Sequence, residues 1–471
     1  MIEAPSPETP GRSEPSDLPL TAVQRTLAAQ TDGFALGRWT PSEVLEAYAR
    51  RIARLNPVLN AVVDTRLEAA RKEAAASTER WANGEPHSDI DGATVLVKAN
   101  IAVDGLPWTA GIKAYERRIA REDAGAVSRL KTAGAVIVGT LNMEEGALGA
   151  VTDNPWLGRC LNPWGAPKGV RGADELTPGG SSGGSGVAAA AGLSAATLGT
   201  DTMGSVRIPA AYCGVSGHKP SRGLIATEGV TPLSHTLDHV GPLTRSARDL
   251  AALTSALAGE HIESGFTFAG RTIGRWRFED AVDCDPEVYA LYEQVIERAR
   301  EAGARIVEVS PEHYQYATSR RRGLLISELE GWAEHENAIE AAPEGFSQTF
   351  RDLLHWGASQ TADKAERAYE AVRACEADAR RWFSDVDIVL APTALEPAFS
   401  FDAEPPAGQA DLTAFADFAG VPATAVCAGL TEAGLPASVQ VIGPKGFDGR
   451  TIAAAAAIEN AAGGPFIPPG Y

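Results

Sequence analysis

The chain has 471 residues, of which 44% are hydrophobic and 22% charged, and both fractions are typical of a globular protein. Acidic residues outnumber basic ones by 61 to 42, which gives a formal net charge of −19. This balance argues against a nucleic-acid partner or an anionic membrane, because both attract concentrated positive charge. The five cysteines are odd in number and never form a CxxC pair, which argues against a disulfide framework or a structural zinc site.

The first 20 residues are rich in Pro, Glu and Ser and offer no apolar run for a signal peptide. We expect residues 1–20 to form a disordered tail. Nowhere does the chain reach the roughly 18 consecutive apolar residues that a membrane-spanning helix needs. A cytoplasmic protein is therefore expected.

Helical signals begin at Thr40, a predicted N-cap that is followed by Pro41 and by Glu43 of a capping box. Apolar residues then recur at helical spacing until Asn56-Pro57, which predicts the end of this helix. A strand is predicted over 93–97, with Lys98 at its C-terminal edge. The other predicted elements are helices over 65–83, 125–133 and 449–462, a helix capped by Asp285, and strands over 136–140, 306–309, 386–393 and 436–444.

This alternation predicts an α/β fold, with a mixed, twisted central β-sheet that α-helices cover on both faces. The segment 255–385 is more helical and more charged than the rest, which indicates an elaboration of the same fold. No Pro/Ser-rich linker divides the chain after residue 20. We therefore expect residues 21–471 to form one domain.

Residues 179–186 are all Gly or Ser ("GGSSGGSG") and allow three interpretations. A flexible linker is one, although the run leads directly into the apolar segment "VAAAAGLSAATLG". A phosphate-binding loop is the second, although the GK[ST] ending of a P-loop is missing. The third is nucleophilic catalysis, in which a Ser attacks and the backbone amides of a second Gly/Ser turn, "GTDTMGSVR", bind an oxyanion.

The chain resembles the amidase signature family from about residue 21 to residue 460. The motifs that carry the resemblance keep the family's order: "GATVLVKAN" (92–100), "PGGSSGGSG" (178–186), "LGTDTMGSVRIPAAYCGVSGHKPSRG" (198–223), "LDHVGPLTRS" (237–246), "VLAPT" (389–393), "GVPATAV" (420–426) and "GLPASVQVIG" (434–443).

The resemblance implies a Ser–Ser–Lys triad without histidine. Ser205 is then the nucleophile, Ser181 the bridging serine on a cis peptide bond, and Lys98 the base. A lysine acts as a base only when neutral, and lowering its pKa from about 10.4 to about 7 takes roughly 4–5 kcal/mol of bias against the charged form. Burial at the end of a strand is the expected source of that bias.

The remaining site residues also follow from the resemblance. Oxyanion and substrate binding is expected from the turn of Thr202, Met203 and Gly204, and from Gly180 and Ser182 in the Gly/Ser run. Behind them, Asp201 and Arg207 are expected to support the turn. We expect no cofactor and no metal: His235 and His239 stand four residues apart, but no third ligand is evident.

The chain departs from the family at four places. Ala99 replaces an Asp that commonly follows the lysine, Met203 replaces a Gly, and Asp417 stands where an Asn is frequent. Residues 165–175 are an insertion that we expect to form a rim loop or lid.

Three functions are compatible with these residues. The first is a hydrolase of small amides, and also of esters or carbamates, whose substrate is a small molecule and which acts alone or as a homodimer. The alternative is the glutaminase subunit of a tRNA-dependent amidotransferase complex. A catalytically silent binding protein is the third, and the presence of Lys98, Ser181 and Ser205 argues against it.

Overall fold

The computed structural model describes residues 23, 26–165 and 175–471. The predicted tail (1–20) and nearly all of the predicted rim loop (165–175) lie outside the described residues. Within the described part, every helix is too short or too polar to cross a membrane.

A single large sheet of eleven strands organises the described chain. Its strands are, in spatial order, β1 (Val62–Thr65), β3 (Val136–Leu141), β2 (Thr94–Lys98), β6 (Ala196–Asp201), β8 (His239–Thr244), β7 (Ser216–Lys219), β12 (Ala423–Leu430), β13 (Pro436–Ile442), β11 (Ile388–Pro392), β9 (Thr272–Trp276) and β10 (Arg305–Val309). A separate short ribbon pairs β4 (Asp153–Asn154) with β5 (Gly158–Arg159).

The sheet is mixed, as predicted. β2 pairs in parallel with β3 and with β6, and β9 pairs in parallel with β10 and β11, whereas β6, β8, β7, β12, β13 and β11 pair antiparallel in succession. Because β2 and β6 are parallel neighbours, their C-terminal residues Lys98 and Asp201 come to the same edge of the sheet.

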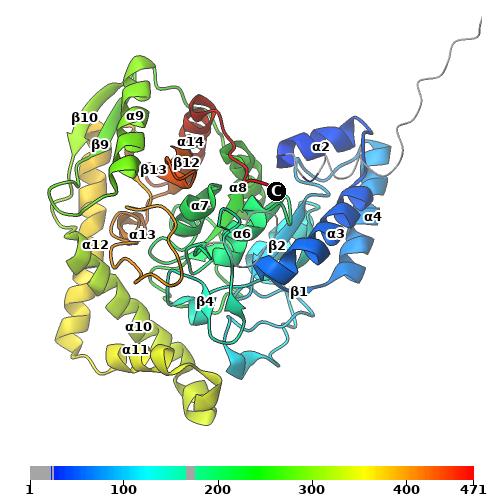
Figure 1. The fold of residues 1–471 in the computed structure, drawn as a ribbon, viewed down its shortest axis with the longest axis horizontal. Coiled ribbons are helices and arrows are strands. Elements are labelled where there is room, and N and C mark those ends of the chain that lie inside the picture. Colours follow the sequence, from blue (N-terminus) through cyan, green and yellow to red (C-terminus); the bar gives the residue numbers. More distant parts are fainter. Residues whose placement is uncertain (1–22, 24–25, 166–174) are drawn as a thin grey trace, which may run out of the picture.

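Helices cover both faces of this sheet, which confirms the predicted fold class (Figure 1). They are α2 (Leu27–Ala35), α3 (Pro41–Leu59), α4 (Leu67–Asn83), α5 (Gly125–Thr132), α6 (Gly183–Ala190), α7 (Arg207–Cys213), α8 (Leu250–Ala258), α9 (Pro286–Glu301), α10 (Tyr316–Ala341), α11 (Gln348–Ala358), α12 (Ala362–Asp385), α13 (Ala414–Ala419) and α14 (Asp448–Ala462). In β2, Val95 and Val97 join one apolar cluster and Leu96 the opposite one, since successive strand residues point to opposite faces.

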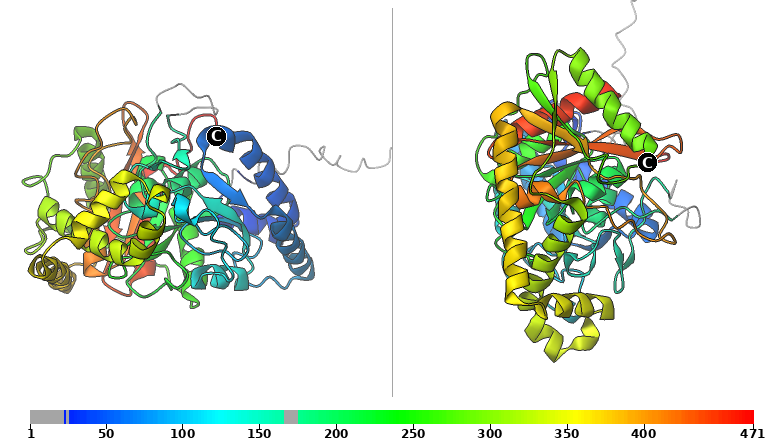
Figure 2. Two further views of the ribbon diagram at one scale, coloured as in Figure 1. Left: turned by 90° about the horizontal axis from the view of Figure 1, so that it is seen from below. Right: turned by 90° about the vertical axis from the view of Figure 1, so that its left-hand side faces the viewer.

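The segment 255–385 supplies the edge strands β9 and β10 as well as the long helices α10 and α12. α10, α11 and α12 pack against one another and extend past the sheet, as the yellow helices of Figures 1 and 2 show. That residues 21–471 form a single domain stays a prediction, which the continuous sheet from β1 to β10 supports.

The predicted capping box of α3 is present, but the predicted end of this helix at Asn56-Pro57 is wrong. α3 continues through Pro57 to Leu59 and closes on Asn60, whose backbone is left-handed (φ 52°). Pro57 lacks the N–H that would bond to the carbonyl of residue 53, so it costs one helical hydrogen bond, and the helix continues for only two residues beyond it. The Asn56 side chain meanwhile accepts hydrogen bonds from the amides of residues 61 and 62, and this fixes the exit of the chain.

The Gly/Ser run 179–186 is buried throughout, so the linker interpretation is wrong. α6 begins inside the run and packs directly on the backbone at the end of β3. A Cβ atom on Gly184 would lie 2.3 Å from the carbonyl oxygen of Asn142. The glycines therefore permit a contact between backbone and backbone, which a larger residue would prevent.

We expect Gly184→Ala to destabilise the protein by about 1–3 kcal/mol, because the methyl group forces backbone atoms apart. Urea denaturation followed by circular dichroism measures this loss. The matched control is Gly265→Ala, since a Cβ atom there meets open space at an ordinary φ. The control should stay within about 0.5 kcal/mol of the parent, and equal losses in the two variants would contradict this account of the packing.

Candidate active site

Lys98, the last residue of β2, is completely buried and ends between two hydroxyl groups. Its Nζ donates to Ser181 Oγ at 2.7 Å and to Thr200 Oγ1 at 2.8 Å. Ser181 comes from the loop before α6, and Thr200 from β6, the strand next to β2. Ser181 and Thr200, which are 83 and 102 positions from Lys98 in the sequence, thus meet it at the end of one strand.

Burial lowers the pKa of Lys98 to about 7, because an ammonium group loses its hydration there. Three carboxyl groups oppose this shift, those of Asp238, Asp201 and Glu144. Each of them stands off from the amine, whose hydrogen bonds go to hydroxyl groups instead. The lysine is therefore poised between its charged and neutral forms near neutral pH.

Ser181 follows a cis peptide bond with Gly180, as the resemblance implies. The carbonyl of Ser181 accepts a hydrogen bond from the amide of Glu144 at 3.1 Å. A Cβ atom on Gly180 would lie 2.8 Å from the backbone of Ala150 and Val151, so only glycine fits beneath this neighbouring loop.

Ser205 is half-buried and lies on the turn between β6 and α7. Its carbonyl accepts from the amide of Ser182 at 3.3 Å, which places the Gly/Ser run beside this turn. The Ser205 hydroxyl makes no hydrogen bond with any residue that the structure describes, so the Lys98–Ser181 contact is formed here and a Ser181–Ser205 contact is not. Catalytic hydrogen bonds are frequently open in ligand-free enzymes.

Asp201 holds the turn of Ser205 in place through hydrogen bonds to its backbone. Its carboxylate accepts from the amides of Gly204 at 2.5 Å and Val206 at 3.1 Å. In this structure Asp201 therefore uses the donor that we expect to bind the oxyanion, and oxyanion binding by the Gly204 amide stays a prediction. Gly204 is needed for its backbone, since its φ is +136° and a Cβ atom would lie 2.3 Å from Thr413 Oγ1.

Gly180 and Ser182, both expected to bind substrate, lie behind the pocket wall. Neither is among the described residues that line the pocket at Ser205. The Ser182 hydroxyl donates to the carbonyl of Thr200 at 3.1 Å, which ties the run to β6. That Gly180 and Ser182 bind substrate stays a prediction.

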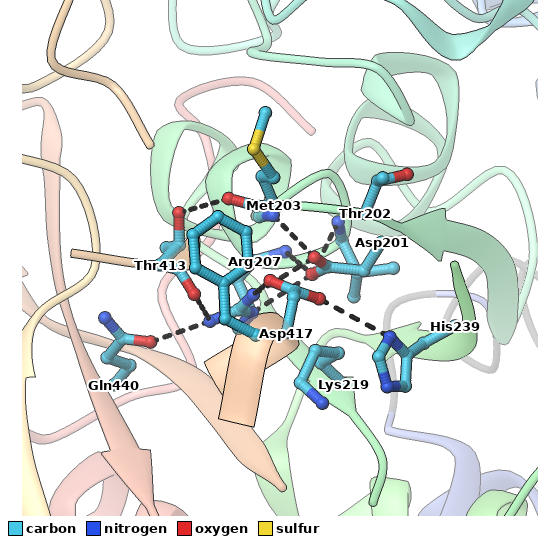
Figure 3. A network of polar contacts seen from close by, with 12 residues as sticks. Asp201, Thr202, Met203, Arg207, Lys219, His239, Thr413, Asp417 and Gln440 are labelled. Carbon is cyan, nitrogen blue, oxygen red and sulfur yellow. Dashed lines mark hydrogen bonds and ion pairs between the residues drawn. The ribbon is translucent and has the colours of Figure 1, made fainter. Parts of the chain in front are cut away.

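Arg207 is fully buried and forms the centre of the polar network drawn in Figure 3. It donates to Asp201 from Nε and Nη2, both at 3.0 Å, and to Asp417 Oδ2 from Nη2 at 2.6 Å. Its Nη1 donates to the carbonyl of Thr413 and to Gln440 Oε1. The guanidinium therefore connects the turn to α13 and to β13.

The pKa values of the two carboxyl groups around Arg207 are shifted in opposite directions. Burial acts to raise the pKa of Asp201, but the Arg207 guanidinium outweighs it and holds that pKa below the usual range. The pKa of Asp417 lies well above its usual range, because of burial and of the nearby Asp201 carboxylate. Asp417, whose effect the sequence left open, thus serves as the second acceptor of a buried arginine.

Two further basic groups face Asp417 in Figure 3. His239 Nδ1 lies 3.5 Å from Asp417 Oδ1, and burial holds the pKa of this histidine well below its usual range. Burial also lowers the pKa of Lys219, to about 8. His235 is exposed on the loop before β8, whereas His239 is buried in β8, so the two histidines do not share a helix face.

Among the described residues, one group of side chains has the spacing of metal ligands: Glu312, His313 and Asp378. Arg381 pairs with both carboxylates of this group, so a positive charge already balances them. The group lies outside the site at Ser205.

The pocket at Ser205 has a volume of about 360 Å³. Its wall is mostly apolar and comes from the loop 147–151, the turn at 202–208, Leu233, α10 and the loop 405–410. Ser205 lines this pocket, whereas Lys98 and Ser181 are buried behind it.

Sequence reasoning missed two groups and underrated a third. Thr200 binds Lys98 directly, and Glu144 accepts from the amides of Val151 and Thr152 at the pocket wall. Asp238, which the sequence analysis left outside the candidate site, accepts from the Thr202 hydroxyl at 2.6 Å. Burial raises the pKa of Glu144 to about 7 and that of Asp238 to about 6. Thr200 adjoins Asp201 in the recognised motif, and that adjacency was the only available signal.

Two other departures from the family pattern, Ala99 and Met203, lie among residues that the structure describes. Ala99 packs in a small apolar cluster with Met143, Ala147 and Leu233. Met203 lines the pocket, and its carbonyl accepts from Thr413 Oγ1 at 2.7 Å. Met203 thus presents an apolar side chain to the pocket.

We expect Asp417→Ala to destabilise the protein by about 3–5 kcal/mol, because it leaves a buried guanidinium with one acceptor fewer. Asp417→Asn keeps an oxygen for Arg207, and its loss should stay below about 1.5 kcal/mol. Urea denaturation at pH 7 measures both variants. Similar losses in the two would contradict the assigned role of Asp417.

The comparisons with known proteins agree with this geometry. The family model described as Amidase matches residues 43–452. A glutamyl-tRNA(Gln) amidotransferase subunit from Roseiflexus sp. (strain RS-1) is 32% identical, over 91% of this chain and 94% of the relative. Its counterpart from Chloroflexus aurantiacus is 33% identical, over 92% and 94%. A crystal structure of an amidase superposes with a TM-score of 0.84 at 34% identity and covers 93% of this chain and 100% of its own. The chain belongs to the amidase signature family of C–N-cleaving enzymes.

Proposed function

We propose that this protein hydrolyses small amides through an acyl-enzyme, with Ser205 as nucleophile, Ser181 as proton relay and Lys98 as base. The observation that carries the proposal is the 2.7 Å hydrogen bond from a completely buried Lys98 to Ser181. A neutral lysine at this place accepts a proton through a hydroxyl group that lies next to the nucleophile's turn.

In the proposed reaction, Ser205 Oγ attacks the amide carbonyl while its proton passes to Ser181, whose own proton passes to Lys98. The carbonyl oxygen becomes an oxyanion, for which the amides of Thr202, Met203 and Ser205 are the remaining donors of the turn. The C–N bond then breaks, and the proton held by Lys98 returns to the leaving amine. Water attacks the ester at Ser205 by the same relay and releases the acid.

The pocket supports a substrate with a mainly apolar part. Apart from Arg320, the described lining residues carry no charge. Free glutamine presents an ammonium and a carboxylate together, and the described lining offers no acidic side chain to the ammonium. This contrast favours a small-amide hydrolase.

The second candidate is a glutaminase subunit of an amidotransferase. It is favoured by the names of the curated relatives, which are subunits of glutamyl-tRNA(Gln) amidotransferases. Turnover of a panel of aryl amides, alkyl amides, esters, carbamates and glutamine separates the two candidates. Turnover of glutamine alone, and only in the presence of a copurifying partner, would replace the first proposal by the second. Size-exclusion chromatography of the same sample tests whether the protein is a monomer or a homodimer.

We expect Ser205→Ala and Lys98→Ala to lower kcat by more than about 1,000-fold, because each removes a member of one relay. Ser181→Ala should leave only a trace of activity. The measurement is steady-state hydrolysis of the best amide of the panel, with circular dichroism to verify folding. Ser128→Ala, on the exposed face of α5, is the control and should retain full activity. Unimpaired turnover by Ser205→Ala would refute the mechanism.

We also expect kcat/KM to rise with pH through about 7 and to level off above pH 8. Lys98 is the base in its neutral form, and its pKa is about 7, so the active fraction falls about tenfold from the plateau to pH 6. A pH series with a neutral substrate measures this. Glu144 titrates in the same range, so Glu144→Gln serves as control. The rising limb should persist in that variant; its disappearance would assign the titration to Glu144 instead of Lys98.

A further inference from the structure

The pocket at Ser205 carries one charged side chain among its described lining residues, and this is Arg320 of α10. Arg320 Nη1 donates to Asp411 Oδ1 at 2.6 Å, and its side chain is 18% exposed. An arginine has five N–H donors, and this bond to Asp411 is the only one that Arg320 makes with the described residues. Most of its donors therefore remain available at the pocket.

Asp411 does not neutralise the pocket itself. Its side chain is 6% exposed and is absent from the described lining, so a ligand in the pocket meets the cation and not the anion. Asp411 holds the guanidinium in place, in the way that a supporting carboxylate orients an arginine for a second, planar partner.

Gln409 provides a second and independent observation. It lines the same pocket, is 5% exposed, and its Oε1 has no hydrogen-bond partner among the described residues. Buried amide groups are normally paired, because an unpaired one loses its hydration without compensation. Because Oε1 only accepts hydrogen bonds, this unpaired atom on a pocket wall indicates an N–H or O–H donor on the ligand.

Both residues lie near the nucleophile's turn. The Sδ of Met203 is 2.6 Å from the place that a Cβ atom on Gly323 would take, so α10 touches the turn at that glycine. Arg320 precedes Gly323 by three residues and therefore shares its helix face. Figure 3 shows the Met203 side chain directed away from the buried network.

We propose that Arg320 binds a carboxylate carried by the amide substrate, while Gln409 Oε1 accepts a hydrogen bond from an N–H group of the same substrate. The preferred substrate then has an apolar segment against Met203 and Leu324 and a carboxylate against Arg320. This inference rests on the proposed hydrolysis at Ser205 and adds the chemical class of the substrate to it. Arg320 acts as a specificity-determining residue, since it binds a group remote from the scissile bond.

Matched pairs of anilides test the proposal. The monoanilides of succinic, glutaric and adipic acid are compared with anilides in which a branched hydrocarbon replaces the carboxylate at equal length. A second series places the carboxylate on the amine, as in N-benzoylglycine against its hydrocarbon analogue. The readout is the ratio of kcat/KM within each pair, for the parent chain and for Arg320→Met.

In at least one pair we expect the parent chain to prefer the carboxylate by about 10- to 100-fold, as for a charge-assisted hydrogen bond. Arg320→Met should remove this preference and leave the hydrocarbon substrate within about threefold of the parent. The single variant leaves Asp411 without its cation and could fold poorly for that reason. The double variant Arg320→Met/Asp411→Asn removes both charges of the pair and should show the same loss of preference as Arg320→Met. Gln409→Leu should lower kcat/KM for both members of a pair alike and leave the preference unchanged. Arg322→Met, which removes a cation from the groove on another side of α10, should change nothing.

A parent chain without any carboxylate preference would overturn the proposal. So would an equal loss on both substrates in Arg320→Met/Asp411→Asn, since this is the result of a purely structural role. Binding separates this failure from a failure of the proposed reaction. Calorimetry of Ser205→Ala with the same monoanilides measures the subsite without turnover. Binding that depends on Arg320, found together with a parent chain that hydrolyses no amide, would refute the mechanism and retain the subsite.

Discussion

The buried contact of Arg207 with Asp201 and Asp417 is the constraint on which the site depends. One guanidinium without access to water joins the end of β6, the start of α7, the helix α13 and the strand β13. A buried cation is costly unless its donors are matched by acceptors, so its acceptors also fix the positions of the elements that carry them. Because Asp201 also accepts from the amides of Gly204 and Val206, it fixes the position of the turn of Ser205 as well.

Lys98, the proposed base, depends on the same sheet in a different way. Lys98 ends a strand that lies between two parallel neighbours, and the burial that this position imposes moves its pKa to about 7. Hydroxyl partners satisfy its N–H groups without adding the negative charge that would hold the proton. Ala99, in place of a common Asp, is consistent with this arrangement, because it keeps a carboxylate away from the next position.

The strongly acidic composition has little to do with the chemistry. The net charge of −19 belongs to the whole chain, whereas the pocket is lined by apolar groups and a single cation among the described residues. The charge at the pocket therefore differs in sign from the net charge of the chain. Loops and α10, the parts that line this pocket, are also where members of one fold differ most readily.

Much of the fold and of the candidate site could be predicted from the amino-acid sequence. Alternating helix and strand signals indicated the mixed sheet, and the family motifs placed Lys98, Ser181 and Ser205 in one site, because motif order and spacing survive in the linear chain. Contacts between distant segments were not readable in this way. Pro57 inside α3, the Gly204 amide bound by Asp201, the Thr200 partner of Lys98 and the Arg320–Asp411 pair each depend on which segments the sheet brings together. Hydrogen bonds and desolvation act over a few ångströms in space, so only the tertiary structure decided which side chains are paired, buried or left facing the substrate.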